Sequence, residues 1–272
     1  LKEAAKMYKS FYSLSDNPFK KEIETKDLYQ SENLKELSAR LDYLKKTRGI
    51  AVIIGEPGSG KTSALRSMAD SVNPSLFKVI YFPLSTGSVM DFYRGIAIGL
   101  GEEPKFRKVD LFNQVQAAIL KFYNEKKITP IIILDEMQLA PNKFLSDLGI
   151  LFNFAMDSQN PFILILAGLS HFMTKLNLNH NQSLNQRVIM KYQLNPLNKE
   201  EVKEYVEHQL KLAGANHPIF ISQALEAIAL RSRGLPRLIN NIAVNSLLLG
   251  FQLKAEQINQ EIVFKACEKD TF

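Results

Sequence analysis

Short apolar runs alternate with amphipathic stretches over the first two thirds of the chain. The apolar runs are rich in β-branched residues and predict buried strands at 50–54, 77–82, 130–134, 161–167 and 189–194. Before and between these runs, apolar residues recur at a spacing that predicts helices over 32–47, 61–72, 88–100, 109–125 and 142–157. Shorter helical pieces are expected at 170–175 and 183–188. Strands that alternate with helices predict an α/β fold, a parallel sheet sandwiched by helices.

The pattern changes near residue 195, after which the spacing predicts helices alone. These helices are expected at 198–213, 220–232, 236–251 and 259–268. Residues 1–30 mix aromatics with turn formers and predict an extended lead-in. We therefore expect three parts: a lead-in over 1–30, an α/β domain over 31–195 and a small all-helical domain over 196–272.

Composition narrows the class of protein. The 272 residues are 46% hydrophobic, enough for a large core, and 34 Lys and Arg against 28 Asp and Glu give a net charge of +6. This excess favours a polyanionic partner, either nucleic acid or an anionic surface. The lone cysteine, Cys267, cannot form an internal disulfide. With no apolar run of about 18 residues and no signal-like start, we expect a cytoplasmic chain without a membrane span.

A glycine-rich segment follows the first predicted strand and opens a predicted helix. Its residues, Gly55-Glu56-Pro57-Gly58-Ser59-Gly60-Lys61-Thr62, match G-x-x-x-x-G-K-[ST] in full. In this pattern backbone N–H groups surround phosphate oxygens, the lysine reaches the β- and γ-phosphates, and the hydroxyl binds Mg²⁺. The sequence therefore predicts a P-loop that binds ATP and Mg²⁺. We expect the phosphates to contact Gly55, Pro57, Gly58, Ser59, Gly60, Lys61, Thr62 and Ser63.

Two adjacent carboxylates end the third predicted strand. Successive side chains at a strand end point to opposite sides, so Asp135 can join Thr62 in the Mg²⁺ shell while Glu136 faces an attacking water. A solvated Asp-Glu turn is the alternative, which the upstream P-loop disfavours. Gln138 can hydrogen-bond in the same pocket.

Two arginines and one basic cluster complete the set of candidates. Arg187 precedes a predicted strand and suits bidentate contact with phosphate, although an arginine there is more often structural. Arg237 lies in the first turn of a helix, where it opposes the helix dipole and a nearby anion would offset the cost. The segment 105–108 interleaves an aromatic with three basic residues, which is typical either of a phosphate-backbone contact or of a solvated loop rim.

Taken in order, these motifs resemble the AAA+ ATPases. Within them, the resemblance is to the group that contains the ExeA/GspA-like secretion ATPases and the transposition ATPases TniB, TnsC and MuB. It covers nearly the whole chain, from the lead-in around Pro18 and Phe19, through 55–62 and the Asp-Glu-x-Gln of 135–138, to Gly-x-Pro-Arg-x-Ile-Asn-Asn at 234–241. It implies an AAA+ α/β ATPase domain with a helical lid.

The resemblance also implies roles for single residues. Arg187 would be an arginine finger given to a neighbouring subunit, and Arg237 a sensor on the lid. Ser170 would be the first sensor residue and Arg237 the second, and Pro18 and Phe19 would lie near the adenine. A finger donated in trans implies a homo-oligomer, a ring or a helical filament. In such assemblies the loops after the second strand and after the paired carboxylates face the DNA, which would place Thr86, Ser88 and Lys143 there, besides Lys105, Arg107 and Lys108 of the basic cluster.

Three functions are compatible with these features. The favoured one is a regulator of DNA transposition that oligomerises on duplex DNA when it binds ATP, recruits a transposase and hydrolyses ATP to disassemble. An ExeA-like secretion-assembly ATPase is the second, and relatives of that kind continue into a membrane span and a cell-wall-binding region. A nucleotide-dependent scaffold with negligible turnover is the third. Glu136, Lys61, Arg187 and Arg237 are the expected catalytic residues.

Overall fold

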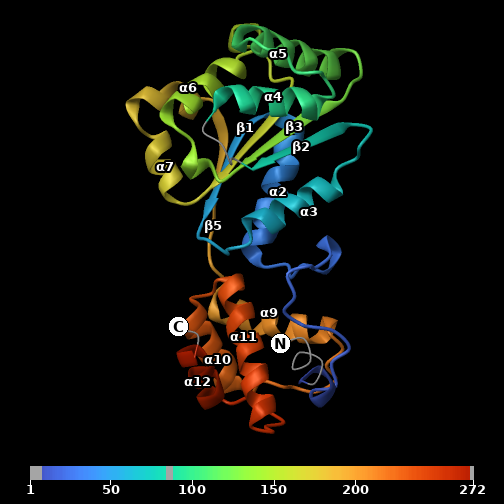
Figure 1. Cartoon of the computed structure of the whole chain (residues 1–272), viewed down its shortest axis with the longest axis vertical. Helices are drawn as coiled ribbons and strands as arrows, with labels where there is room; N and C mark the ends of the chain where they lie inside the picture. Colours follow the sequence, from blue (N-terminus) through green and yellow to red (C-terminus); the bar gives the residue numbers. More distant parts are fainter. Residues whose placement is uncertain (1–7, 84–87, 270–272) are drawn as a thin grey trace. The chain divides into compact units, whose positions relative to one another are not determined.

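The computed structural model describes residues 8–83 and 88–269, which divide into two compact units (Figure 1). The α/β unit comprises Leu34–Gly55 and Lys61–Leu194. The helical unit comprises the residues before 34, the five residues Glu56–Gly60 and the residues from Asn195 onward.

A parallel sheet forms the centre of the α/β unit. Its strands among the described residues are β1 (Gly49–Gly55), β2 (Phe77–Pro83), β3 (Thr129–Asp135), β4 (Ile163–Gly168) and β5 (Val188–Leu194), in the order β2-β3-β4-β1-β5. Every neighbouring pair is parallel, which confirms the predicted sheet. The interior strands β1, β3 and β4 are almost wholly buried, whereas the edge strand β5 alternates buried and exposed positions. The runs at 50–54, 130–134 and 161–167 therefore became interior strands, buried on both faces, whereas those at 77–82 and 189–194 became the two edges.

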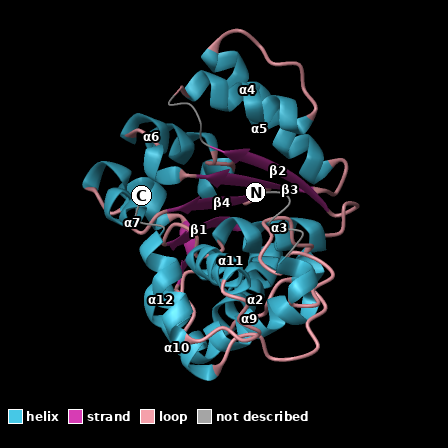
Figure 2. Ribbon diagram, turned by 60° about the horizontal axis from the view of Figure 1, so that its bottom comes forward, coloured by secondary structure: helices cyan, strands magenta, loops and turns pink. Residues whose placement is uncertain are grey.

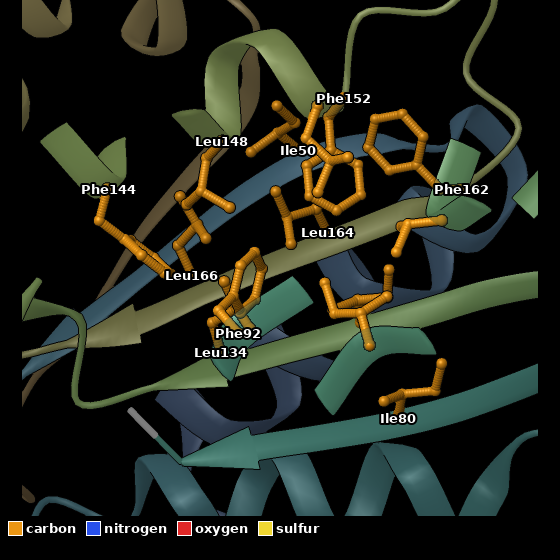
Figure 3. Close-up of a cluster of buried hydrophobic side chains, with 14 of the residues drawn as sticks. Ile50, Ile80, Phe92, Leu134, Phe144, Leu148, Phe152, Phe162, Leu164 and Leu166 are labelled. Carbon is orange, nitrogen blue, oxygen red and sulfur yellow. The ribbon is translucent and has the colours of Figure 1, made fainter. Parts of the chain in front are cut away.

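Helices cover both faces of this sheet, because alternate side chains of each strand point to opposite sides (Figure 2). Ala51 and Ile53 of β1 pack with α2 (Glu32–Thr47) and α3 (Lys61–Ser71). Ile50 and Val52 face the other layer, and Figure 3 shows part of that core. The second layer contains α4 (Val89–Leu100), α5 (Lys108–Asn124), α6 (Asn142–Leu151), α7 (His171–Leu176) and α8 (Gln182–Gln186).

The helix predicted over 142–157 is too long, since α6 ends at Leu151. Phe152 and Phe154, two residues apart, both pack on Phe162, with ring centroids 4.6 and 5.6 Å away. A helix cannot direct residues i and i+2 to one side. The chain therefore leaves the helix and forms a 3-10 turn, η3 (Ala155–Asp157), whose three residues all have left-handed φ angles of 47°, 53° and 69°. Apolar spacing alone could not reveal this change of backbone.

The helical unit confirms the four helices predicted after residue 195. They are α9 (Lys199–Leu212), α10 (Ser222–Ser232), α11 (Pro236–Gln252) and α12 (Gln260–Lys269). Asn198 begins α9 with a capping box: its side chain accepts from the Glu201 backbone N–H, and the Glu201 carboxylate accepts from that of Asn198. Each cap satisfies N–H groups that a helix start leaves unpaired.

The described part of the lead-in packs into the core of the helical unit. Tyr8, Tyr12, Leu14 and Phe19 are buried there, and the Tyr12 hydroxyl donates to the Ala255 carbonyl at 2.9 Å. Apart from a helical turn at 8–11 and the 3-10 turn η1 (Thr25–Asp27), this part is irregular, as predicted. Three of its aromatics, Tyr8, Tyr12 and Phe19, are thus core residues.

Candidate nucleotide site

The glycine-rich segment joins the end of β1 to the start of α3, the strand–loop–helix context that a P-loop needs. Gly58 and Gly60 have φ angles of 80° and 100°, a region that residues with side chains rarely adopt. Within the loop, the Ser59 N–H donates to the Glu56 carbonyl at 3.2 Å. The backbone therefore turns tightly where phosphate is expected, and Pro57 lies exposed at this turn.

Two polar side chains of this segment are buried. Lys61 is 9% exposed and its Nζ donates to the Gly55 carbonyl at 2.9 Å. The Ser59 hydroxyl has no hydrogen-bond partner among the described residues, although Ser59 is only 7% exposed. A buried hydroxyl without a partner costs about 1–3 kcal/mol. A phosphate oxygen would accept its hydrogen bond, so this orphaned group fits a bound nucleotide.

Asp135 lies at the end of β3 and is 3% exposed. Its Oδ2 accepts from the Thr62 hydroxyl at 3.1 Å, and its Oδ1 accepts from the Glu136 N–H at 2.9 Å. A hydroxyl and a carboxylate that converge in this way are hard oxygen donors of the kind Mg²⁺ prefers. The donor set therefore fits the predicted metal. Ser63 follows Thr62 in the first turn of α3 and is half-buried.

Tyr81 of β2 is a site residue that the sequence analysis missed. Its hydroxyl donates to Asp135 Oδ2 at 3.1 Å, although its ring is half-exposed. Burial, followed by the negative charge of Asp135, raises the pKa of Tyr81 to about 12. The phenol is therefore neutral and a donor at physiological pH. The sequence held one indication of this role. Tyr81 lies near the carboxyl end of a predicted parallel strand, and the carboxyl ends of β2 and β3 lie at the same edge of the sheet.

We expect Tyr81→Phe to lower kcat/KM for ATP about tenfold, because partners of a metal-binding carboxylate typically contribute that much. The raised pKa means that the hydrogen bond is fully present below the ordinary pKa of 10.0 and is lost as pH rises through about 12. The activity profile between pH 6 and 9 should therefore keep its shape. Steady-state ATPase assays across this range check both points, and an unchanged kcat/KM would contradict the role of Tyr81.

Glu136 has a left-handed backbone, with φ 61° and ψ 34°. Its carboxylate accepts a 2.6 Å hydrogen bond from Gln138, which lies in the 3-10 turn η2 (Met137–Leu139). A non-glycine residue in this region costs about 1–3 kcal/mol and persists where its surroundings impose it, often at functional sites. Ser170, the sensor candidate, is half-buried at the start of α7 and its side chain makes no cap hydrogen bond.

Arg187 is held by its own chain. Its Nε lies 3.1 Å from Asp157 of η3, and its guanidinium also donates to the Gly149 carbonyl. The side chain is 18% exposed. In this structure the predicted finger thus has partners within the α/β unit.

Arg237 lies in the first turn of α11 in the helical unit, and its N–H donates to the Gly58 carbonyl at 3.3 Å. A methyl group added at Gly58 would lie 2.7 Å from the Arg237 Cβ, so this close approach needs glycine. Later in the same motif, Asn240 accepts from the Tyr205 hydroxyl at 2.8 Å. Residues of the segment 234–241 thus also stabilise the helical unit. Pro18 and Phe19 are buried in the same unit, and their predicted position near adenine stays a prediction.

The predicted DNA contacts differ in their surroundings. Lys105 and Arg107 line a shallow hollow of about 440 Å³ with Phe106, which is 90% exposed, and with two carboxylates, Glu103 and Asp110. Lys108 instead pairs with Asp147 at 2.7 Å. Ser88 caps α4, and Lys143 is exposed in the first turn of α6. Thr86 lies outside the described residues.

Two features are absent from the described residues. No cluster of three or more His, Cys, Asp or Glu side chains there could bind a metal ion. Over the same part of the chain, no helix is both long and apolar enough to cross a membrane.

Comparison with known proteins gives matches of three kinds. The family model of the AAA domain matches residues 44–176. General secretion pathway protein A of Aeromonas hydrophila is 29% identical over 255 residues, which are 93% of this chain and 46% of that protein. The chain therefore spans about half the length of this curated relative.

Solved structures share the fold at low identity. The Aeropyrum pernix ORC2 protein, in ADPNP and ADP complexes, superposes with a TM-score of 0.69 at 17% identity, covering 94% of this chain and 72% of its own. The Aeropyrum pernix ORC1 protein in complex with DNA gives 0.64 at 16% identity, with 90% and 66% covered. The chain therefore has the AAA+ P-loop fold.

Proposed function

We propose that the chain is an ATP-controlled regulator of DNA transposition. It assembles on duplex DNA when it holds Mg²⁺-ATP, recruits a transposase there and disassembles after hydrolysis. The observation that carries the nucleotide part is the convergence of Thr62, Asp135 and Glu136 at the carboxyl edge of the sheet. Ligands of open α/β sheets bind at this edge.

In this proposal each side chain has one task. Lys61 binds the β- and γ-phosphates, and Thr62 and Asp135 hold Mg²⁺, which neutralises phosphate charge when bound. Glu136 orients the attacking water and accepts its proton. Arg237 binds the nucleotide from the lid.

Arg187 would complete the site of a neighbouring copy by stabilising charge on the transferred phosphoryl group. It must then exchange Asp157 for phosphate when two copies meet, since its own chain holds it in this structure. Assembly and hydrolysis would thus depend on each other.

Two observations support DNA as the partner. The chain carries six more basic than acidic residues, and this charge favours a polyanion. Ser88 and Lys143 follow the ends of β2 and β3, so both lie toward the edge of the sheet that holds the nucleotide residues. A conformational change caused by ATP binding would then reach Ser88 and Lys143 through the ends of β2 and β3. The Aeropyrum pernix ORC1 protein in complex with DNA shares the fold.

Fluorescence anisotropy with a short duplex tests this proposal. The titrations are made with a slowly hydrolysed ATP analogue at several salt concentrations. The logarithm of the association constant for the duplex should fall linearly with the logarithm of the salt concentration, with a slope of about 0.9 per phosphate neutralised. Lys143→Ala should reduce that slope by about one. Lys265→Ala, an exposed lysine of α12, is the matched control and should change it less. No duplex binding at low salt in the presence of the analogue would refute the DNA proposal.

A secretion-assembly ATPase is the second candidate, and the similarity to general secretion pathway protein A along 93% of this chain favours it. It predicts ATP-dependent self-association that is unaffected by duplex DNA. Sedimentation velocity with and without duplex therefore separates the two candidates. The sequence of the complete gene provides a second test, because a membrane span and a cell-wall-binding region would favour secretion.

A further inference from the structure

We propose that Gln138 is a positioning residue for Glu136, and that it couples the water-orienting carboxylate to the end of β4. The inference rests on the proposed role of Glu136. The Gln138 Nε2 donates to Glu136 Oε2 at 2.6 Å, and its Oε1 accepts from the Leu169 N–H at 3.1 Å. The Leu169 donor fixes which end of the amide is oxygen, so the NH₂ group must face the carboxylate.

The turn that carries Gln138 is firmly anchored. Met137 is fully buried. Lys175 of α7 donates from its Nζ to the carbonyls of Gln138 and Ala140, at 3.0 and 2.7 Å. The Lys175 carbonyl in turn accepts from Asn181 at 2.9 Å. Gln138 therefore extends toward Glu136 from a backbone that α7 holds in place.

The Gln138 amide oxygen, at the other end of the side chain, is closely packed against the end of β4. A methyl group added at Gly168, the last residue of β4, would lie 3.1 Å from Gln138 Oε1 and 3.4 Å from the backbone nitrogens of Met137 and Gln138. Only glycine lets the two segments approach this closely without displacement. The amide thus spans a narrow gap between the end of β4 and the Glu136 carboxylate.

The Glu136 side chain needs such a partner. Its left-handed backbone directs the side chain away from the regular strand geometry, and a flexible carboxylate can adopt many rotamers. A charge-assisted hydrogen bond from an anchored amide restricts them. Water must be aligned with the phosphoryl group within narrow limits, so losing this restraint should slow chemistry more than nucleotide binding.

The test compares three variants by kcat, KM and nucleotide affinity. Gln138→Ala should lower kcat about tenfold, and Gln138→Glu somewhat more, because it keeps an acceptor for Leu169 but faces Glu136 with a like charge. KM and the dissociation constant of a fluorescent ATP analogue should stay within about twofold. Gln114→Ala is the matched control, since the Gln114 amide also bridges a donor and an acceptor, the Lys105 N–H and the Glu103 carbonyl, and it should leave kcat unchanged.

Combining substitutions separates positioning from a purely structural effect. In a Glu136→Gln background, Gln138→Ala should cause no further loss of turnover, because the group that it positions is already absent. Gln138→Met keeps the length of the side chain without its hydrogen bonds, and it should reproduce the kcat loss with an unchanged melting temperature.

Three results would overturn the inference. They are an unchanged or raised kcat in Gln138→Ala, a loss confined to KM and nucleotide affinity, and additive losses in the double variant. If Glu136→Gln itself keeps wild-type turnover, the proposed role of Glu136 fails instead, and the two failures are thereby distinguished.

Discussion

Lys61→Ala is expected to weaken ATP binding about 100-fold or more. The ammonium group of Lys61 is buried and donates to the neutral Gly55 carbonyl at 2.9 Å. Bound phosphates would replace that carbonyl with charge-assisted hydrogen bonds worth about 1.5–3 kcal/mol each. Two such bonds correspond to about two to four orders of magnitude in affinity.

A fluorescent ATP analogue titrated into wild type and variant measures this effect. Lys121→Ala removes an exposed lysine from α5 of the same unit and should bind like wild type. Wild-type affinity in Lys61→Ala would show that the glycine-rich segment does not bind the phosphates. ATP-driven assembly of that variant on DNA would contradict control by nucleotide.

Glu136→Gln is expected to lower kcat by about 10²–10⁴-fold while ATP affinity changes only a few-fold. The amide is nearly isosteric with the carboxylate but cannot accept the proton of the attacking water, and a general base contributes about this factor. Because the Lys61, Thr62 and Asp135 groups remain, nucleotide binding should persist.

Phosphate-release assays under saturating ATP measure the loss, with Glu125→Gln, an exposed residue at the end of α5, as the control. The DNA-regulator proposal further predicts that Glu136→Gln assemblies outlast those of wild type, since hydrolysis drives disassembly. A scaffold with negligible turnover predicts little difference between the two proteins. Equal turnover would therefore exclude Glu136 as the base.

The sequence predicted the parts of the fold in which local pattern and tertiary structure agree. The runs at 50–54 and 130–134 are apolar on both faces, so they could only be interior strands, and they became β1 and β3. The P-loop and the Asp135-Glu136 pair follow directly from these strands. Their approach was also predictable, because the carboxyl ends of parallel strands share one edge.

The remaining features depend on contacts between distant segments. Tyr81 meets Asp135 because β2 and β3 are neighbours, and strand order is not encoded in local spacing. The end of α6 depends on Phe162, which is eleven residues beyond Leu151 and draws Phe152 and Phe154 into the core. Likewise, Arg187 pairs with Asp157 in the left-handed turn η3, which apolar spacing does not predict.

Electron microscopy of the protein with duplex DNA and a slowly hydrolysed ATP analogue tests the central claim most directly. The account predicts rings or filaments around the duplex for wild type, no assemblies for Lys61→Ala, and none for wild type with ADP. Assemblies that form equally well without nucleotide, or a protein that stays monomeric on DNA with the analogue, would contradict it.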